Sequence, residues 1–161
     1  YIQEKGFTII GAHELARDLL VPTGQLGKVS PTERDKADIT AGMRIVKAVG
    51  ALDIGQAAII RDGYVLAVEA AEGTDGLLSR SAAFAWEERA GVLVKLSKPG
   101  QELKADMPTI GPDTVTLAAE ANLRGIALEE KKTLILDLKE SIRRADAAGI
   151  FLIGLDPESG S

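Results

Sequence analysis

The spacing of apolar side chains predicts an amphipathic helix in the first half of the chain. After Ser30, the residues Ile39, Met43 and Val46 recur at helical spacing with charged side chains between them, which is typical of a helix with one buried face. Ser30 and Glu33 flank its expected start, because a serine cap and an acidic residue three positions later form a capping box. We therefore expect a long helix that begins just after Ser30.

Shorter apolar runs, rich in β-branched residues, predict strands. The clearest pair is separated by Asp62-Gly63, a strong signal for a β-hairpin. Expected strands cover residues 57–61, 64–69, 92–96, 126–128, 133–136 and 150–153, and the fourth and fifth of these are expected to form a second hairpin. Further helices are expected at residues 77–88, with Trp86 on the buried face, from 112 onward, and from Asp137 to about 147. This succession predicts an α/β (mixed α+β) fold, a layered sheet with helices, built from β-hairpins and βαβ units.

A change in composition between residues 22 and 29 predicts a domain boundary. This stretch contains two glycines and few apolar residues, and is therefore typical of a linker. We expect residues 1–29 to be an arm or linker from a missing amino-terminal domain, and residues 30–161 to form one carboxy-terminal domain. His13 then lies on the arm, where it is interpreted as a surface or interface residue.

The composition excludes several classes of function. The chain has 24 acidic and 19 basic residues, a formal net charge of −5, and no dense basic cluster with interleaved aromatic residues, so nucleic-acid binding is not expected. The absence of cysteine and the single histidine exclude disulfides, thiolate chemistry and multi-histidine metal centres in this sequence. Acid–base chemistry is therefore left to carboxylates, lysines, a metal-bound water or His13. No apolar run approaches the roughly 20 residues of a membrane span and no signal-peptide pattern opens the sequence, so we expect a cytoplasmic protein.

A polar loop after the expected strand at residues 64–69 is the first candidate site. Gly73 and Thr74 lie where this strand leads into a helix, and the backbone N–H groups and hydroxyl at such a helix start can hold a phosphate. Arg80, one to two turns along the helix, is placed to reach the same anion. The alternative interpretation is that Thr74 or Asp75 only caps the helix and that Gly73 permits the turn.

A second polar loop follows the expected strand at residues 92–96 and favours phosphoryl-transfer chemistry. Its candidate residues are Lys95, Lys98, Gln101, Lys104 and Asp106. Lysines attract anions, a glutamine can orient a phosphate oxygen or a water, and an aspartate can hold Mg²⁺ or accept a proton from attacking water. The alternative is a solvated loop in which Asp106 is a cap-like partner of Thr109. Gln56, just before the first hairpin, joins the candidates because a buried amide that points into a site must find its partners there.

Four motifs in a fixed order carry a resemblance to a known family. They are Asp53-Ile54-Gly55-Gln56, then residues 66–75 ending in Glu72-Gly73-Thr74-Asp75, then Val94-Lys95 with Lys98-Pro99 and Gln101, and finally Asp106-Met107-Pro108-Thr109-Ile110-Gly111. Together they resemble the carboxy-terminal domain of the LpxI family, the UDP-2,3-diacylglucosamine pyrophosphatases of lipid A biosynthesis. The similarity runs from residue 11 to residue 154.

The resemblance implies a two-domain enzyme of which this chain is the carboxy-terminal part. It implies hydrolysis of UDP-2,3-diacylglucosamine by water attack at the α-phosphorus, giving UMP and 2,3-diacylglucosamine 1-phosphate (lipid X), with Mg²⁺ as cofactor. Asp106, in the Asp-x-Pro-Thr-Ile-Gly motif, is implied as the catalytic residue, either as a metal ligand or as the group that activates the water. The full set of expected substrate-binding residues is Thr74, Asp75, Arg80, Lys95, Lys98, Gln101 and Gln56.

The expected partners follow from this substrate. They are a lipid-linked nucleotide sugar and the amino-terminal domain of the same protein, with a homodimer as a further interpretation. Membrane contact is expected to be peripheral, at the inner membrane, because acyl chains need an apolar surface but the chain has no basic amphipathic anchor helix. Two rival hypotheses are a non-catalytic nucleotide- or sugar-phosphate-binding module, which does not need Asp106, and a structural or dimerisation domain whose loops are only turns.

Overall fold

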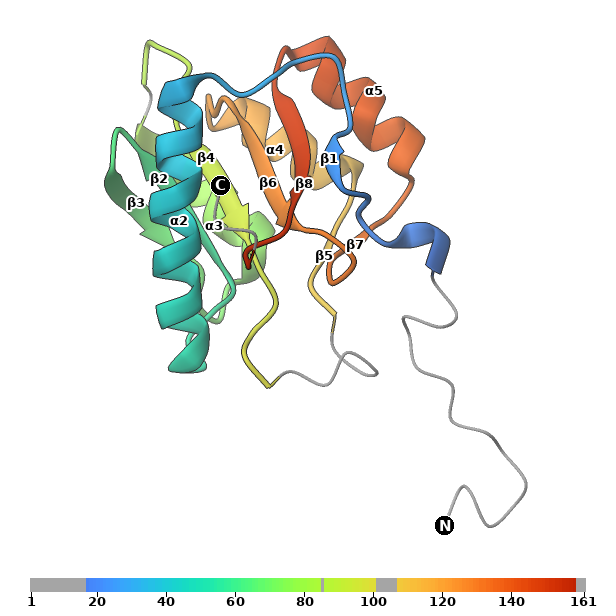
Figure 1. Ribbon diagram of the computed structural model, residues 1–161. Coiled ribbons are helices and arrows are strands. Elements are labelled where there is room, and N and C mark those ends of the chain that lie inside the picture. The colour runs from blue at the N-terminus through green and yellow to red at the C-terminus, as the bar shows by residue number, and fades with distance from the viewer. Residues whose placement is uncertain (1–16, 85, 101–106, 159–161) are drawn as a thin grey trace, which may run out of the picture.

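A six-stranded mixed sheet forms the centre of the computed structural model, which describes residues 17–84, 86–100 and 107–158 (Figure 1). The strands are β1 (Gly24–Gln25), β2 (Ala57–Arg61), β3 (Tyr64–Val68), β4 (Val92–Lys95), β5 (Thr109–Ile110), β6 (Gly125–Glu129), β7 (Leu134–Ile135) and β8 (Phe151–Leu155). The helices are α2 (Glu33–Ala51), α3 (Gly73–Ser81), α4 (Pro112–Glu120) and α5 (Leu138–Ala148), with short 3-10 turns η2 (Arg17–Leu19) and η3 (Ala82–Phe84).

The strand order places the ends of several strands at one edge of the sheet. The order is β1-β8-β6-β4-β2-β3; β4, β6 and β8 are parallel, whereas β1, β2 and β3 pair antiparallel with their neighbours. Strands β5 and β7 form a separate two-stranded parallel sheet. The carboxyl ends of β4, β6 and β8 therefore share an edge with the start of β2 and the end of β3, and ligands commonly bind at such an edge. The mixed α/β fold class is confirmed.

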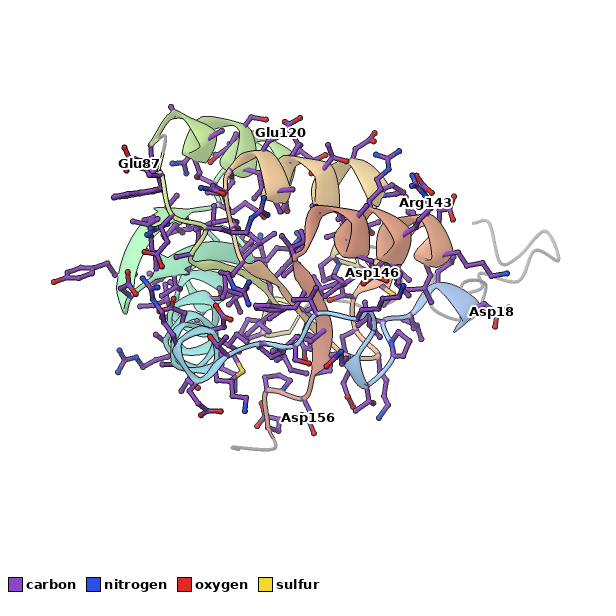
Figure 2. All side chains as sticks on the ribbon, turned by 90° about the horizontal axis from the view of Figure 1, so that it is seen from above. Asp18, Glu87, Glu120, Arg143, Asp146 and Asp156 are labelled. Carbon is purple, nitrogen blue, oxygen red and sulfur yellow. The ribbon has the colours of Figure 1, made fainter. Side chains whose placement is uncertain are left out.

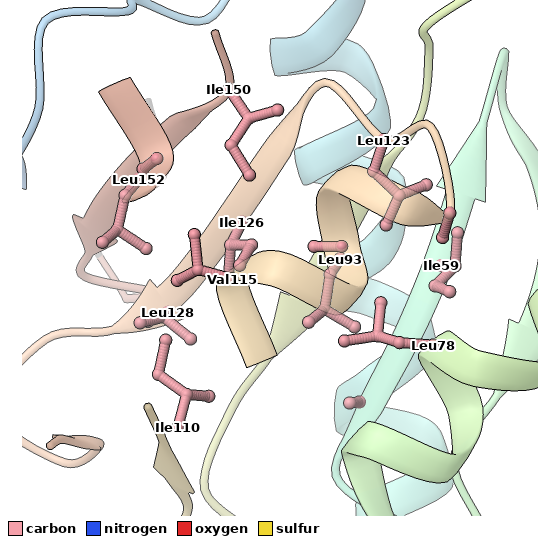
Figure 3. Packing of buried hydrophobic residues seen from close by; sticks show 14 of the residues in the cluster. Ile59, Leu78, Leu93, Ile110, Val115, Leu123, Ile126, Leu128, Ile150 and Leu152 are labelled. Carbon is pink, nitrogen blue, oxygen red and sulfur yellow. The ribbon is translucent and has the colours of Figure 1, made fainter. Parts of the chain in front are cut away.

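Helices cover both faces of the sheet and divide the apolar core in two. Along β4, Val92 and Val94 belong to the cluster under α2, whereas Leu93 belongs to the cluster under α3, α4 and α5. Figure 3 shows Leu93, Ile126 and Val115 of the second cluster between the sheet and α4. Because side chains alternate along a strand, Lys95 continues the face of Leu93 and points towards the side of α3.

The outer faces of the helices are charged. Figure 2, which looks down on the layers, shows Glu120 and Arg143 at the outer surface of the layer formed by α3, α4 and α5. None of the helices in the described ranges is long and apolar enough to cross a membrane.

The capping box of α2 lies two residues later than predicted. The Thr32 backbone N–H donates to Asp35 Oδ2 at 2.8 Å, and the Asp35 N–H donates to Thr32 Oγ1 at 3.3 Å. The hydroxyl of Ser30 donates instead to the Gln25 side chain at 2.8 Å. The predicted cap at Ser30 is wrong because Asp35 is buried and also contacts Arg124 at 3.5 Å, which stabilises the later start.

The predicted second hairpin is also wrong. Strand β6 pairs in parallel with β4 and β8, and β7 pairs with β5 in the other sheet. Every residue of β6 is buried, as expected for a central parallel strand covered on both faces. The turn at residues 129–133 therefore connects two sheets rather than two strands of one hairpin.

Trp86 does not lie on a buried helix face. The helix ends at Ser81 and is followed by the turn η3, so Trp86 falls outside it and is 40% exposed. Its ring stacks under the guanidinium of Arg61, whose Cζ lies 4.6 Å from the ring centroid. The prediction extended this helix to residue 88 because apolar residues continue at helical spacing. Packing ends the helix at Ser81, and the sequence pattern does not show this.

Part of the segment interpreted as a linker belongs to the sheet. Strand β1 pairs antiparallel with β8, with Gly24 opposite Gly154. Val21 is only 1% exposed and lies in the core cluster under α3, α4 and α5. A connection from this segment to an amino-terminal domain stays a prediction.

Candidate active site

Two helix amino termini open onto one cavity at the carboxyl edge of the sheet. Helix α3 begins at Gly73, whose φ of +75° suits glycine, and α4 begins at Pro112, a favoured residue for the first helical position. Neither N-cap residue, Glu72 or Gly111, supplies a side-chain cap hydrogen bond to its helix. The cavity of about 480 Å³ is lined by Glu72, Gly73, Thr74, Asp75, Thr109, Ile110, Gly111, Pro112, Asp113, Thr114 and Leu136. The N–H groups and dipoles of the two helix starts favour an anion in this cavity, whereas the carboxylates of Glu72, Asp75 and Asp113 oppose one that binds without a cation.

A hydrogen bond joins the two helix starts across the cavity. The hydroxyl of Thr114 donates to Asp75 Oδ1 at 2.9 Å and accepts from the Gly111 backbone N–H at 3.3 Å. This bond holds the Glu-Gly-Thr-Asp motif against the Pro-Thr-Ile-Gly motif. Two motifs that are far apart in the sequence are therefore parts of one site.

A buried polar chain lies directly behind Thr74. The Lys95 ammonium donates to Thr74 Oγ1 at 2.7 Å, and Thr74 Oγ1 donates to Glu69 Oε2 at 2.5 Å. Lys95 Nζ also lies 3.5 Å from Glu69 Oε2, and the two charged side chains are only 3% and 7% exposed. Of the expected substrate-binding residues, Thr74, Asp75 and Lys95 are thus brought together.

The proton of Thr74 limits what its hydroxyl can do. A threonine hydroxyl has one proton to donate, and here that proton points to Glu69. While this bond holds, a phosphate bound in the cavity meets the backbone N–H groups of the helix start rather than a hydroxyl donor. A contact of Thr74 with a phosphate stays a prediction.

Arg80 lies at the rim of the site, in contact with the segment that precedes α3. Its guanidinium donates to Glu72 Oε1 at 3.0 Å and to the Val68 carbonyl oxygen at 2.6 Å. The Glu72 carboxylate accepts from its own backbone N–H and from Arg80, and these bonds lower its pKa below the ordinary value. Arg80 therefore orders the turn before α3, and its contact with substrate stays a prediction.

Lys98 lies on the other side of the edge, away from this cavity. Its ammonium donates to Asp53 Oδ1 at 2.8 Å, which lowers the pKa of Asp53. Lys98 lines a separate cavity of about 330 Å³, together with Lys47, Lys132 and Glu129. The structure therefore does not bring Lys98 and Thr74 into one cavity.

The buried carboxylate of Glu129 anchors the start of the second loop. Glu129 Oε2 accepts from the Ser97 N–H and from the Ser97 hydroxyl, both at 2.7 Å. Its other oxygen lies 2.8 Å from Lys132 Nζ. The chain that leaves β4 is therefore fixed to the end of β6 before it reaches Lys98.

Gln56 is partly buried at the start of β2, beside this loop. Its carbonyl oxygen accepts from the Leu96 N–H at 3.0 Å, and its side-chain Oε1 is buried without a hydrogen-bond partner among the described residues. A buried amide oxygen without a partner is expected to receive one from a ligand or from another part of the protein.

Gln101 and Asp106 lie outside the described residues, so their roles stay predictions. The residues that follow Asp106 are described: the Pro108 carbonyl accepts from the Leu134 N–H at 2.8 Å, and Thr109 lines the cavity. In the ranges 17–84, 86–100 and 107–158, no three His, Asp or Glu side chains are grouped to hold a metal ion.

Sequence reasoning missed Glu69 and Thr114 as residues of the site, and Glu129 as the anchor of the neighbouring loop. Glu69 directly follows β3 and Glu129 is the last residue of β6, and this position is a usable signal because ligands commonly bind beyond strand ends at such an edge. Thr114 had no such signal, since its importance depends on the approach of α3 to α4.

The family model for the LpxI C-terminal domain matches residues 22–153. The chain belongs to the LpxI family. A UDP-2,3-diacylglucosamine pyrophosphatase LpxI from Caulobacter vibrioides is 44% identical over 162 residues, which cover 97% of this chain and 58% of that relative. The chain thus spans 58% of the length of the relative. The LpxI match includes β1, which agrees with the pairing of β1 and β8 in the sheet.

Proposed function

We propose that this domain contributes to the hydrolysis of UDP-2,3-diacylglucosamine at the α-phosphate, giving UMP and 2,3-diacylglucosamine 1-phosphate (lipid X) for lipid A biosynthesis. The observation that carries the proposal is the meeting of two uncapped helix starts at one cavity, formed by the Glu-Gly-Thr-Asp and Pro-Thr-Ile-Gly motifs. A pyrophosphate carries negative charge along its length, and helix amino termini are suited to bind it. The named activity of the Caulobacter relative supports the same substrate.

The reaction is a displacement at phosphorus. The water oxygen forms a bond to the α-phosphorus, the bond between that phosphorus and the bridging oxygen breaks, and the sugar 1-phosphate leaves. The water loses one proton, which Asp106 accepts in one version of the proposal. The helix starts stabilise the charge that develops on the phosphate oxygens, and the Lys95 ammonium adds positive charge from behind Thr74, outside the cavity lining.

Mg²⁺ is the proposed cofactor, held by Asp106 in the other version of the proposal. Protein sites for Mg²⁺ commonly supply one or two carboxylates, while substrate phosphates and waters complete the shell. Asp75, whose carboxylate lines the cavity, is a described oxygen donor beside the proposed phosphate position. When bound, the ion would neutralise charge on the pyrophosphate.

The remaining partners are proposed from the substrate. Since the chain spans 58% of the relative, an amino-terminal domain is proposed to close the site and to cover the acyl chains. Contact with the inner membrane is proposed to be peripheral and on the cytoplasmic side, and a homodimer is a further proposal.

The test is Asp106→Ala in the intact protein, with Asp156→Ala as the matched control. Asp156 is an exposed aspartate at the same edge that does not line the cavity of the two helix starts. Turnover of UDP-2,3-diacylglucosamine should fall by about 100-fold or more in Asp106→Ala, because a general base contributes about 10²- to 10⁴-fold. Substrate binding should persist, and the control should keep wild-type turnover. Unchanged turnover in Asp106→Ala would contradict the catalytic assignment.

The second candidate function is a non-catalytic nucleotide- or sugar-phosphate-binding module. It is favoured by the same cavity, because an anion can bind at the two helix starts without Asp106. Wild-type protein that binds the substrate in the presence of Mg²⁺ without releasing UMP would select this function instead.

A further inference from the structure

We infer that Glu69 is a positioning residue, which holds the Lys95 ammonium in its working place both directly and through the hydroxyl of Thr74. The inference rests on the proposed function for its catalytic readout. Its basis is the chain of contacts from Lys95 Nζ to Thr74 Oγ1, at 2.7 Å, and from Thr74 Oγ1 to Glu69 Oε2, at 2.5 Å.

The direction of the protons makes the arrangement specific. An ammonium can only donate and an ionised carboxylate can only accept, so the hydroxyl between them must accept from Lys95 and donate to Glu69. The carboxylate therefore sets the orientation of the Thr74 proton and leaves an oxygen lone pair directed at Lys95. An apolar side chain in the place of Glu69 would not fix the orientation of the Thr74 hydroxyl proton.

Burial strengthens the effect of the Glu69 carboxylate on Lys95. The side chains of Lys95 and Glu69 are 3% and 7% exposed, and their charged atoms lie 3.5 Å apart. A nearby negative charge stabilises a buried ammonium, so loss of the Glu69 charge is expected to shift Lys95 from its position. Displacement by about 1 Å near a reacting centre can cost about 100-fold in rate.

A glycine of the first family motif supports the backbone of Glu69. A Cβ added to Gly55 would lie 2.0 Å from the Glu69 carbonyl oxygen, so the two backbones approach more closely than a side chain permits. The Glu69 N–H donates to the Ala57 carbonyl oxygen at 2.9 Å, which fixes the preceding peptide unit as well. The Asp53-Ile54-Gly55-Gln56 motif and the Glu-Gly-Thr-Asp motif are thereby joined at Glu69.

The experiment is a double-mutant cycle in the intact protein with Glu69→Gln and Thr74→Val. Each single variant should lower kcat by about 10- to 100-fold with a small change in KM, because Lys95 acts on charge that develops in the transition state. If Glu69 acts through Thr74, the kcat of the double variant should fall no further than that of the worse single variant. If the fold losses in kcat of the two single variants multiply in the double variant, the inference is overturned. Thr74→Ser, which keeps the hydroxyl, should retain turnover, and its loss of turnover to the level of Thr74→Val would also overturn it.

A chemical readout separates this inference from the proposed function. The acetylation rate of Lys95 by acetic anhydride, measured by peptide mass spectrometry, should rise several-fold in Glu69→Gln and Thr74→Val but not in Thr74→Ser. Lys132, which is 46% exposed and pairs with Glu129, is the internal standard and should be labelled equally in all variants. Unchanged Lys95 labelling would overturn the inference whatever the turnover. Wild-type protein without turnover but with this labelling pattern would contradict the proposed function and leave the positioning of Lys95 supported.

A matched control tests whether any buried carboxylate at this edge gives the same effect. Glu130 is also largely buried and pairs with Lys131 at 2.8 Å, but it does not contact the chain of Lys95, Thr74 and Glu69. Glu130→Gln should leave kcat and Lys95 labelling at wild-type values. An equal effect in Glu130→Gln would mean that general destabilisation, not positioning, explains the Glu69 variant, and would overturn the inference.

Discussion

Replacing Gly55 by alanine should damage both the stability of the fold and the proposed active site. The added Cβ would lie 2.0 Å from the Glu69 carbonyl oxygen and 2.7 Å from its carbonyl carbon. Ordinary van der Waals contact begins at 3.4 Å, so the two backbones must separate by about 1.4 Å to accept the methyl group. The obstacle is backbone that is also hydrogen-bonded to Ala57, so a change of side-chain rotamer does not relieve it.

The magnitude follows from the nature of this obstacle. Overpacking of a rigid site costs about 1 to 3 kcal/mol, and a clash with paired backbone belongs at the upper end of that range. A loss of about 3 kcal/mol in a domain of this size lowers Tm by about 6 to 12 °C. The same movement carries Glu69 away from Thr74 and Lys95, so kcat for UDP-2,3-diacylglucosamine should fall by about 10-fold or more.

The assay compares Gly55→Ala with Gly50→Ala by urea unfolding, and measures turnover of both at a temperature where both are folded. A Cβ on Gly50 would come no closer than 3.3 Å to the flexible ring of Pro99, and alanine is favoured over glycine in a helix by about 1 kcal/mol. Gly50→Ala should therefore change the free energy of unfolding by less than about 1 kcal/mol. Equal stabilities of the two variants would refute the close approach at Glu69. A destabilised Gly55→Ala with full kcat would refute the link from this backbone contact to catalysis.

Three further predictions concern the ends of the helices and the first strand. Thr114→Val removes the bond to Asp75 and should lower the free energy of unfolding by about 1.5 kcal/mol in urea titration, since bonds to charged groups contribute about 1.5 to 3 kcal/mol. Two arginines on α5 donate to Glu140 and lower its pKa from 4.5 to about 2, so its stabilising contribution is present above pH 4.5 and is lost as the pH falls towards 2. The difference in Tm between wild type and Glu140→Gln should therefore shrink as the pH falls from 6 to 3. A Tm difference that stays constant over this range would contradict the stabilising role of the Glu140 charge. Gly154→Ala places a Cβ 1.9 Å from the Pro22 carbonyl oxygen and should expose residues 20–27 to limited proteolysis.

Local patterns predicted the elements whose formation depends on neighbours in the sequence. The hairpin of β2 and β3 around Asp62-Gly63 is confirmed, as is the start of α5, where Asp137 accepts from the Glu140 N–H at 3.2 Å. In both cases the determining contacts span only a few residues, so the sequence contains the signal in full. Polar loops after strands were likewise recognised as candidate sites because strand ends are visible in the pattern.

Elements that depend on distant partners were not predictable in this way. Residues 126–128 were predicted as one half of a hairpin, but they belong to β6, whose burial on both faces comes from α2 on one side and the other helices on the opposite side. The predicted linker contained a strand because Gly24 pairs with Gly154, 130 positions away, and two-residue strands have no periodicity to detect. The contact of Thr114 with Asp75 depends on the same kind of long-range packing.

The alternation of side chains along β4 explains why the fold and the proposed site are inseparable. Val92 and Val94 face α2, whereas Leu93 packs under α4 and α3, and the next residue on that face is Lys95. The register that buries Leu93 therefore also directs the Lys95 ammonium to the start of α3, where the Thr74 hydroxyl oxygen accepts a hydrogen bond from it. A shift of β4 by one residue, with Val94 in the place of Lys95, would put a valine behind Thr74. It would also turn Leu93 to the face that α2 covers. Core packing thus sets the position of the Lys95 ammonium, and the buried carboxylate of Glu69 stabilises the charge there.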